Sequence, residues 1–140
     1  ILIYLEPSGS GVCWKKYYII MTLSEAVKTC LVDKYATFSG RATRSEYWYY
    51  CLFCILLWLF LIVLLTIVGN PELLTWISVI IGVLFIIPNW SVTFRRLHDI
   101  GRSGWCVLIC LIPYLGSIIL LIMMCLNSDE DNEYGPKPLN

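Results

Sequence analysis

The sequence predicts an all-α integral membrane protein with three transmembrane helices, and this prediction comes from its composition and from three long apolar segments. Hydrophobic residues make up 59% of the 140 residues. Charged residues make up 14%, whereas soluble domains carry about 25%. An apolar helix needs about 20 residues to cross the hydrocarbon of a bilayer. The segments 47–68, 73–94 and 105–126 are long enough and contain no Asp, Glu, Lys or Arg.

The first two segments are joined by residues 68–72, VGNPE, which predict a tight turn between antiparallel helices. The third segment contains Pro113 and Gly116. A break at these residues would leave two pieces of about ten residues, each too short to cross the bilayer as a helix. We therefore expect one kinked crossing here, with a re-entrant pair of short pieces as the alternative.

The positions of the basic residues predict the orientation. Nine of the ten lysines and arginines precede Trp105, and the last fourteen residues carry four acids beside Lys137. Because basic flanking residues stay on the cytoplasmic side, the N-terminus is predicted inside and, after three crossings, the C-terminus outside. The ten basic and ten acidic residues cancel, so net charge gives no reason to expect a nucleic-acid partner.

The chain divides into four predicted parts. Residues 1–20 are interpreted as a non-native or upstream extension, because their apolar pieces are short and Met21 resembles a natural start. Residues 21–46 form a cytoplasmic N-terminal segment. Residues 47–126 form the transmembrane domain, with a cytoplasmic loop at 91–104, and residues 127–140 form an acidic tail.

A short amphipathic helix is expected at the start of the N-terminal segment. Apolar residues recur there at helical spacing, and they are Leu23, Ala26, Val27, Cys30 and Leu31. Such a helix can lie on the inner membrane surface or pack on the protein itself. Both interpretations fit the pattern.

Two motifs are predicted to share the cytoplasmic face. The sequence 43–46 fits a capping box in which Thr43 and Glu46 fix the start of the first membrane helix, and Ser103 is a candidate cap for the third. Glu46 and Asp99 can each meet arginines of the other motif, which predicts a polar cluster with surplus positive charge. The candidate residues are Arg41, Arg44, Glu46, Arg95, Arg96, His98, Asp99 and Arg102.

Surplus guanidinium at the inner headgroup level suits an anionic phosphate, such as a lipid headgroup. Arginines that only set the membrane orientation are the simpler interpretation. His98 beside Asp99 could handle a proton, but no catalytic residue is assigned because no motif supplies a nucleophile. Most cysteines fall in apolar segments, where they usually pack, so neither a disulfide framework, a metal nor a cofactor is expected.

Three motifs in order around the apolar segments resemble a known family. They are FSGRATRSEYW at 38–48, RRLHDIGRSGW at 95–105 and NEYGPKP at 132–138. The sequence from 37 to 138 resembles the small bacterial inner-membrane proteins grouped as domain of unknown function 805. The resemblance implies a helical protein of the cytoplasmic membrane without a settled activity, and it supplies no catalytic residue.

Three functions remain open from the sequence. The first is a non-enzymatic membrane component whose cytoplasmic cluster binds anionic lipid or a protein partner. The second is an oligomeric transport or channel subunit, although few polar residues lie in the apolar segments to line a path. The third is a membrane enzyme acting on a lipid phosphate through His98 and Asp99.

Overall fold

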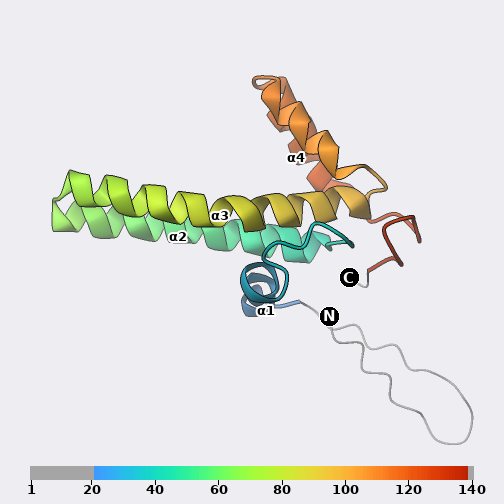
Figure 1. Cartoon of the computed structure of the whole chain (residues 1–140), viewed down its shortest axis with the longest axis horizontal. Coiled ribbons are helices and arrows are strands. Elements are labelled where there is room, and N and C mark those ends of the chain that lie inside the picture. The colour runs from blue at the N-terminus through green and yellow to red at the C-terminus, as the bar shows by residue number, and fades with distance from the viewer. Residues whose placement is uncertain (1–20, 139–140) are drawn as a thin grey trace, which may run out of the picture.

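In the computed structural model, which describes residues 21–138, the regular elements are all helical, so the all-α prediction is confirmed there. The interpretation of residues 1–20 lies outside the described residues. Helices α2 and α3 lie antiparallel, α1 lies across one end of this pair, and α4 projects from it (Figure 1). The elements are α1 (Leu23–Lys28), the π-helix η1 (Thr29–Asp33), α2 (Arg44–Val68), α3 (Pro71–Asp99), the 3-10 helix η2 (Gly104–Leu111) and α4 (Leu115–Cys125).

The tight turn between α2 and α3 is confirmed. Gly69 ends α2 with a φ of 68°, a left-handed conformation that glycine adopts at little cost. The Asn70 side chain then accepts a hydrogen bond from the Leu73 amide at 3.1 Å, and Pro71 occupies the first helical position. The cap that ends one helix and the cap that starts the next are adjacent, so the chain reverses within two residues.

Both helices of this hairpin are long and apolar enough to cross a membrane. They contain 25 and 29 residues, which correspond to about 37 and 43 Å at 1.5 Å per residue, against about 30 Å of hydrocarbon. Within the most apolar stretch of 18 residues in each helix, only 11% of α2 and 6% of α3 are buried inside the protein. A core helix of a soluble protein would be mostly buried, so these exposed apolar surfaces fit contact with lipid.

The expected single kinked crossing at residues 105–126 is not confirmed, because two short helices take the place of one long helix there. Residues 104–111 form a 3-10 helix of 8 residues and residues 115–125 an α-helix of 11 residues. Each spans about 16 Å, roughly half of the hydrocarbon thickness. The chain turns between them at Tyr114, which has a φ of 62°, and Gly116 packs where a Cβ would lie 1.8 Å from the Ile109 carbonyl oxygen. The lengths of the two helices fit the alternative expectation of two short apolar pieces.

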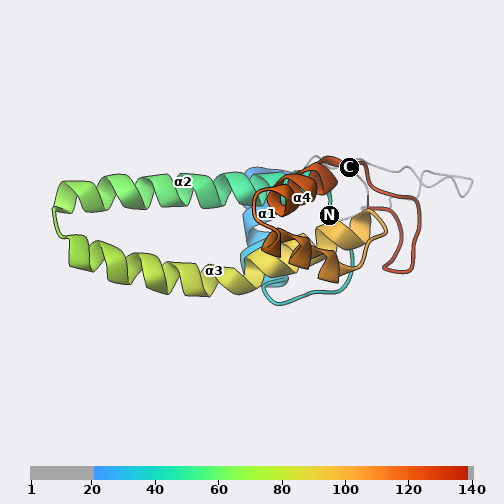
Figure 2. The ribbon, with the colours of Figure 1, turned by 90° about the horizontal axis from the view of Figure 1, so that it is seen from above.

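The C-terminal tail is also placed differently from the prediction. Because η2 and α4 lead out and back, the tail returns to the end of the hairpin where α2 starts and α3 ends, and the view from above shows it there (Figure 2). The Asp129 amide donates a hydrogen bond to the Asp99 carbonyl at 3.0 Å. A tail on the opposite side of the membrane from residues 91–104 is therefore inconsistent with this structure.

The predicted N-terminal helix is present and packs on the protein. A full capping box starts α1, in which Thr22 accepts from the Glu25 amide and the Glu25 side chain accepts from the Thr22 amide. Ala26 and Cys30 are fully buried, and Cys30 belongs to a core cluster with residues of α2 and α3. Of the two sequence interpretations, packing on the protein is the one observed.

Candidate functional site

The first ion pair of the site joins the start of α2 to the end of α3. Thr43 caps α2 by accepting a hydrogen bond from the Glu46 amide at 3.0 Å, as expected. The Glu46 carboxylate does not complete the capping box, because it accepts from the Arg95 guanidinium instead. A charge-assisted bond to guanidinium is stronger than one to a neutral amide. Both side chains are buried, at 4% and 0% exposure.

The second ionic group centres on Asp99 at the last residue of α3. Its carboxylate accepts from Arg41 Nε at 2.9 Å and from the Arg96 guanidinium. The Ser128 hydroxyl donates to the same carboxylate. Since Asp99 and Arg96 are fully buried and Arg41 is nearly so, this group lies inside the protein.

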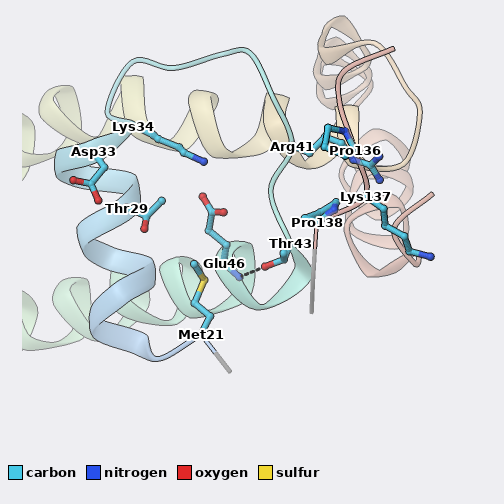
Figure 3. Close-up of a pocket in the computed structure, with 10 residues that line it drawn as sticks. All are labelled: Met21, Thr29, Asp33, Lys34, Arg41, Thr43, Glu46, Pro136, Lys137 and Pro138. Atoms are coloured by element: carbon cyan, nitrogen blue, oxygen red, sulfur yellow. Dashed lines mark hydrogen bonds between the residues drawn. The ribbon is translucent and has the colours of Figure 1, made fainter. Parts of the chain in front are cut away.

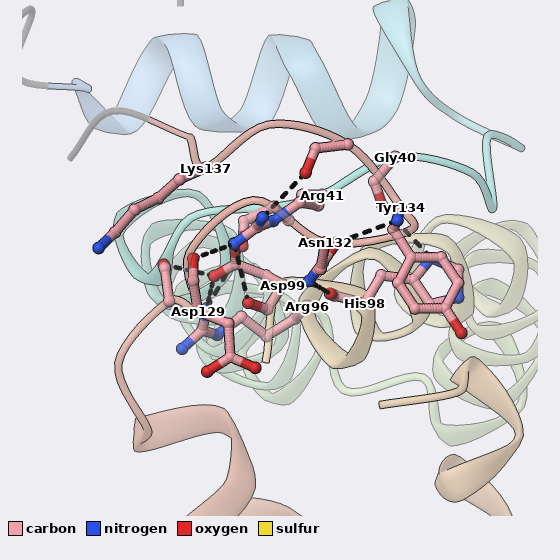
Figure 4. A network of polar contacts seen from close by, with 12 residues as sticks. Gly40, Arg41, Arg96, His98, Asp99, Asp129, Asn132, Tyr134 and Lys137 are labelled. Carbon is pink, nitrogen blue, oxygen red and sulfur yellow. Dashed lines mark hydrogen bonds and ion pairs between the residues drawn. The ribbon is translucent and has the colours of Figure 1, made fainter. Parts of the chain in front are cut away.

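The arginines also hold the tail through backbone carbonyl groups (Figure 4). Arg41 donates to the carbonyls of Asp129 at 2.6 Å, Glu130 at 2.8 Å and Gly135 at 3.0 Å. Arg96 donates to the carbonyls of Met124 and Leu126 at the end of α4. We call Arg41, Glu46, Arg95, Arg96 and Asp99 the arginine cluster.

The sequence expected the pairing of Glu46 and Asp99 with arginines of the other motif, and the structure brings these residues together. The sequence did not identify the tail as a third component of this polar site. Three of the five arginines expected to face the membrane surface, Arg41, Arg95 and Arg96, are buried, and Arg41 donates to tail carbonyls. Only the NEYGPKP motif pointed to this segment, since backbone carbonyls leave no mark on a sequence.

His98 and Asp99 are adjacent in sequence but contact different groups. His98 Nδ1 lies 3.2 Å from the Gly40 carbonyl oxygen, and because a carbonyl only accepts, Nδ1 carries the hydrogen. The ring stacks on Tyr134 with a centroid distance of 3.9 Å, and Asn132 Nδ2 donates to the His98 carbonyl at 2.9 Å. The His98 ring thus packs on the tail, whereas the Asp99 carboxylate points into the arginine cluster.

Arg44 and Arg102 are the two predicted arginines outside the arginine cluster. Arg44 is half-buried at the start of α2, and Arg102 is exposed before η2. Arg102 lines a groove of about 700 Å³ between η2 and the end of α4. The remaining groove residues are Ile100, Cys106, Ile109, Met123, Leu126, Asn127 and Asp129.

A second, smaller cavity of about 330 Å³ separates η1 from the tail (Figure 3). Lys34 extends into it from the end of η1 and Glu46 from the start of α2, and Pro136 and Pro138 of the tail also line it. Cys30 lies next to this region, with Sγ 3.8 Å from Glu46 Oε1. Burial, and next the Glu46 carboxylate, raise the pKa of the Cys30 thiol to about 12, so this thiol stays protonated.

A metal site is not evident in the part of the chain that the structure describes. Among residues 21–138, no three His, Cys, Asp or Glu side chains are grouped closely enough to hold an ion. The described cysteines are free thiols.

Comparison with known proteins gives a consistent result. The family described as "Protein of unknown function (DUF805)" matches residues 35–136. The inner membrane protein YhaH of Escherichia coli K12 is 36% identical over 117 residues, which cover 77% of this chain and 92% of that protein. The inner membrane protein YhaI of the same strain is 32% identical over 109 residues, covering 77% and 91%. No solved structure matches the chain.

Proposed function

Since the chain belongs to the DUF805 family and is an inner-membrane protein, we propose that it is a non-enzymatic membrane component that binds an anionic phospholipid at its cytoplasmic face. Arg102 is the residue that holds the phosphate. The single observation that carries this proposal is an exposed arginine, Arg102, in the lining of a groove that also contains several apolar side chains. The arginine cluster has a different role, because its guanidinium groups are buried and bonded within the protein.

The groove suits both ends of a phospholipid. Cys106, Ile109 and Met123 form an apolar wall along which an acyl chain can lie. Arg102 offers up to two parallel hydrogen bonds to a phosphate at the rim. The outer faces of η2 and α4 expose large apolar side chains, including Leu111 and Leu115 at 78% and 65% exposure. The two elements that form the groove therefore carry apolar surface that lipid chains can cover.

Asp129 narrows the choice of headgroup. Its carboxylate lines the same groove as Arg102, and a phosphate monoester with two negative charges would be repelled by it. A phosphodiester carries one negative charge. Hydroxyl groups on its headgroup can donate to Asp129 and to the Asn127 side chain, both of which line the groove. We therefore infer a preference for a glycerol-bearing phosphodiester, such as phosphatidylglycerol.

The proposed topology is a two-crossing hairpin, α2 and α3, followed by a re-entrant apolar pair, η2 and α4. The tail bonded to Arg41 then shares a side with the start of α2. Each lysine and arginine between residues 21 and 138 lies on this side, and the turn at Gly69 and Asn70 carries none. By the positive-inside rule this side is cytoplasmic.

Native mass spectrometry of the detergent-solubilised protein tests the lipid site. We expect wild type to retain phosphatidylglycerol in preference to phosphatidylcholine with the same acyl chains. Arg102→Gln should weaken this retention about tenfold, since a charge-assisted pair to phosphate is lost. Arg44→Gln is the matched control and should retain the lipid. Equal retention by wild type and Arg102→Gln, or equal loss in both variants, would contradict the proposal.

The observations favour binding over the enzymatic alternative. An enzyme acting on a lipid phosphate through His98 and Asp99 would need both side chains at one substrate. Here Asp99 is fully buried under Arg41 and Arg96, and the His98 ring packs against Tyr134.

A further inference from the structure

A third pocket, separate from the groove at Arg102 and from the cavity at Lys34, is lined by residues at the start of η2. Its volume is about 600 Å³, and aromatic rings supply much of its wall. The rings come from the loop before α2, from the end of α3, from η2 and from the tail. The side chains that matter here are Phe38, Phe94, His98, Trp105, Glu133 and Tyr134.

The rings are fixed by contacts with one another. Phe94 packs edge-on against Phe38 with a centroid distance of 5.4 Å and against Trp105 at 6.0 Å. Gly104 allows this approach, because a Cβ there would lie 2.2 Å from a carbon of the Phe94 ring. Trp105 is nevertheless 68% exposed, so part of its indole surface is free.

From this arrangement we propose that the pocket binds an organic ammonium group, preferably a primary one. Aromatic faces attract cations through their quadrupole, and Trp does so best. Glu133 adds a carboxylate at the same pocket, and no lysine or arginine of residues 21–138 lines it. This combination of aromatic rings and one carboxylate favours a cation and disfavours an anion.

His98 provides the reason to expect a primary ammonium. Its Nδ1 hydrogen is used by the Gly40 carbonyl, so Nε2 is the remaining acceptor of the neutral ring. A primary ammonium has three N–H donors, which can serve Nε2 and the Glu133 carboxylate together. A trimethylated ammonium has no donor and would leave Nε2 without a partner. N-methylation of the ligand should therefore weaken binding.

The position of the pocket fits a lipid headgroup as the source of this ammonium. Trp105 stands where the chain enters the apolar pair η2 and α4, and Trp90 stacks on Phe94 with a centroid distance of 6.2 Å. Tryptophan at such a position is typical of the membrane interface. A phosphatidylethanolamine headgroup presents a primary ammonium at this depth, and a soluble amine presents the same chemistry from the cytoplasm.

The test compares two lipids that differ only in N-methylation. Native mass spectrometry of the full chain in detergent should find phosphatidylethanolamine retained about fivefold more than phosphatidylcholine with the same acyl chains. Glu133→Gln should remove this preference. Glu130→Gln is the matched control, because Glu130 lies in the same tail, does not line the pocket and has an 88% exposed side chain.

A second arm identifies the source of the amine. Ethanolamine is added to the protein while the indole N–H resonance of Trp105 is followed by NMR, with Trp105→Phe giving the assignment. If ethanolamine shifts the Trp105 resonance and Glu133→Gln abolishes this shift, the site is open to soluble amines. If phosphatidylethanolamine is preferred but ethanolamine causes no shift, the lipid headgroup is the source of the amine. Equal retention of both lipids by wild type together with no Trp105 shift, or a preference or shift that survives Glu133→Gln, overturns the proposal. Arg102→Gln should leave the preference intact, which separates this site from the proposed anionic-lipid groove.

Discussion

Replacing Asp99 with asparagine is the most direct test of how the tail is held. The Asp99 carboxylate is fully buried and accepts from Arg41 at 2.9 Å, from Arg96 and from Ser128. Asparagine keeps the shape but removes the charge, so two buried guanidinium groups lose their shared counterion. Removing one partner of a buried ion pair costs about 3–5 kcal/mol. At roughly 4 °C per kcal/mol for a chain of this length, the unfolding midpoint should fall by about 12–20 °C.

Two measurements check this expectation. Circular dichroism of the detergent-solubilised protein gives the unfolding midpoint, and a glutamate-specific protease reports on the tail through Glu130 and Glu133. Asp99→Asn should lower the midpoint and speed cleavage of the tail in the folded protein. The control is Glu130→Gln, which breaks only the exposed pair with Lys137 and should melt like wild type. An Asp99→Asn protein with an unchanged midpoint and an unchanged cleavage rate would refute the role assigned to the arginine cluster.

Three further predictions concern the re-entrant pair, the buried thiol and the topology. Gly116→Ala should destabilise the protein by about 1–3 kcal/mol in thermal unfolding, since its Cβ would overlap the Ile109 carbonyl. Gly82→Ala is the control, because a Cβ there meets nothing within 4 Å, and it should be neutral or stabilising. Equal effects of Gly116→Ala and Gly82→Ala on thermal unfolding would count against the close contact of Gly116 with Ile109. Cys30, with its pKa raised to about 12, should resist alkylation from pH 7 to 9 in the folded protein and react in denaturant; ready labelling of the folded protein would argue against its burial. A reporter fused after residue 140 should give a cytoplasmic signal, and a periplasmic signal would reject the proposed topology.

The hairpin could be predicted because its signals are local. Residues 68–72 contain the cap that ends one helix and the cap that starts the next. Each cap forms its hydrogen bond with a residue at most four positions away in the sequence. The length of an apolar segment likewise measures its ability to cross a bilayer. Thr43 at the start of α2 is a local signal of the same kind.

The third segment could not be predicted in this way because its conformation depends on distant contacts. Pro113 and Gly116 are compatible with a kink and with a reversal, and hydropathy is the same for both. The close contact of Gly116 with Ile109 and the docking of the tail on Arg41 and Arg96 occur only in the folded chain. The tail was expected on the opposite side because three crossings were counted, whereas the bonds that hold it to Arg41 use its backbone carbonyls.

The arginine cluster shows why surplus basic charge in a sequence does not by itself indicate a ligand site. Arg41, Arg95 and Arg96 face two carboxylates, so one positive charge has no formal counterion. Arg96 donates to carbonyls at the C-terminal end of α4, where the helix dipole is negative, and Arg41 donates to tail carbonyls. An anion bound at the cluster would have to displace these carbonyls, so anion binding there and docking of the tail exclude each other. Phosphatidylglycerol that leaves tail cleavage unchanged would therefore be bound outside the cluster, as proposed for Arg102, whereas phosphatidylglycerol that accelerates cleavage would assign the site to the cluster.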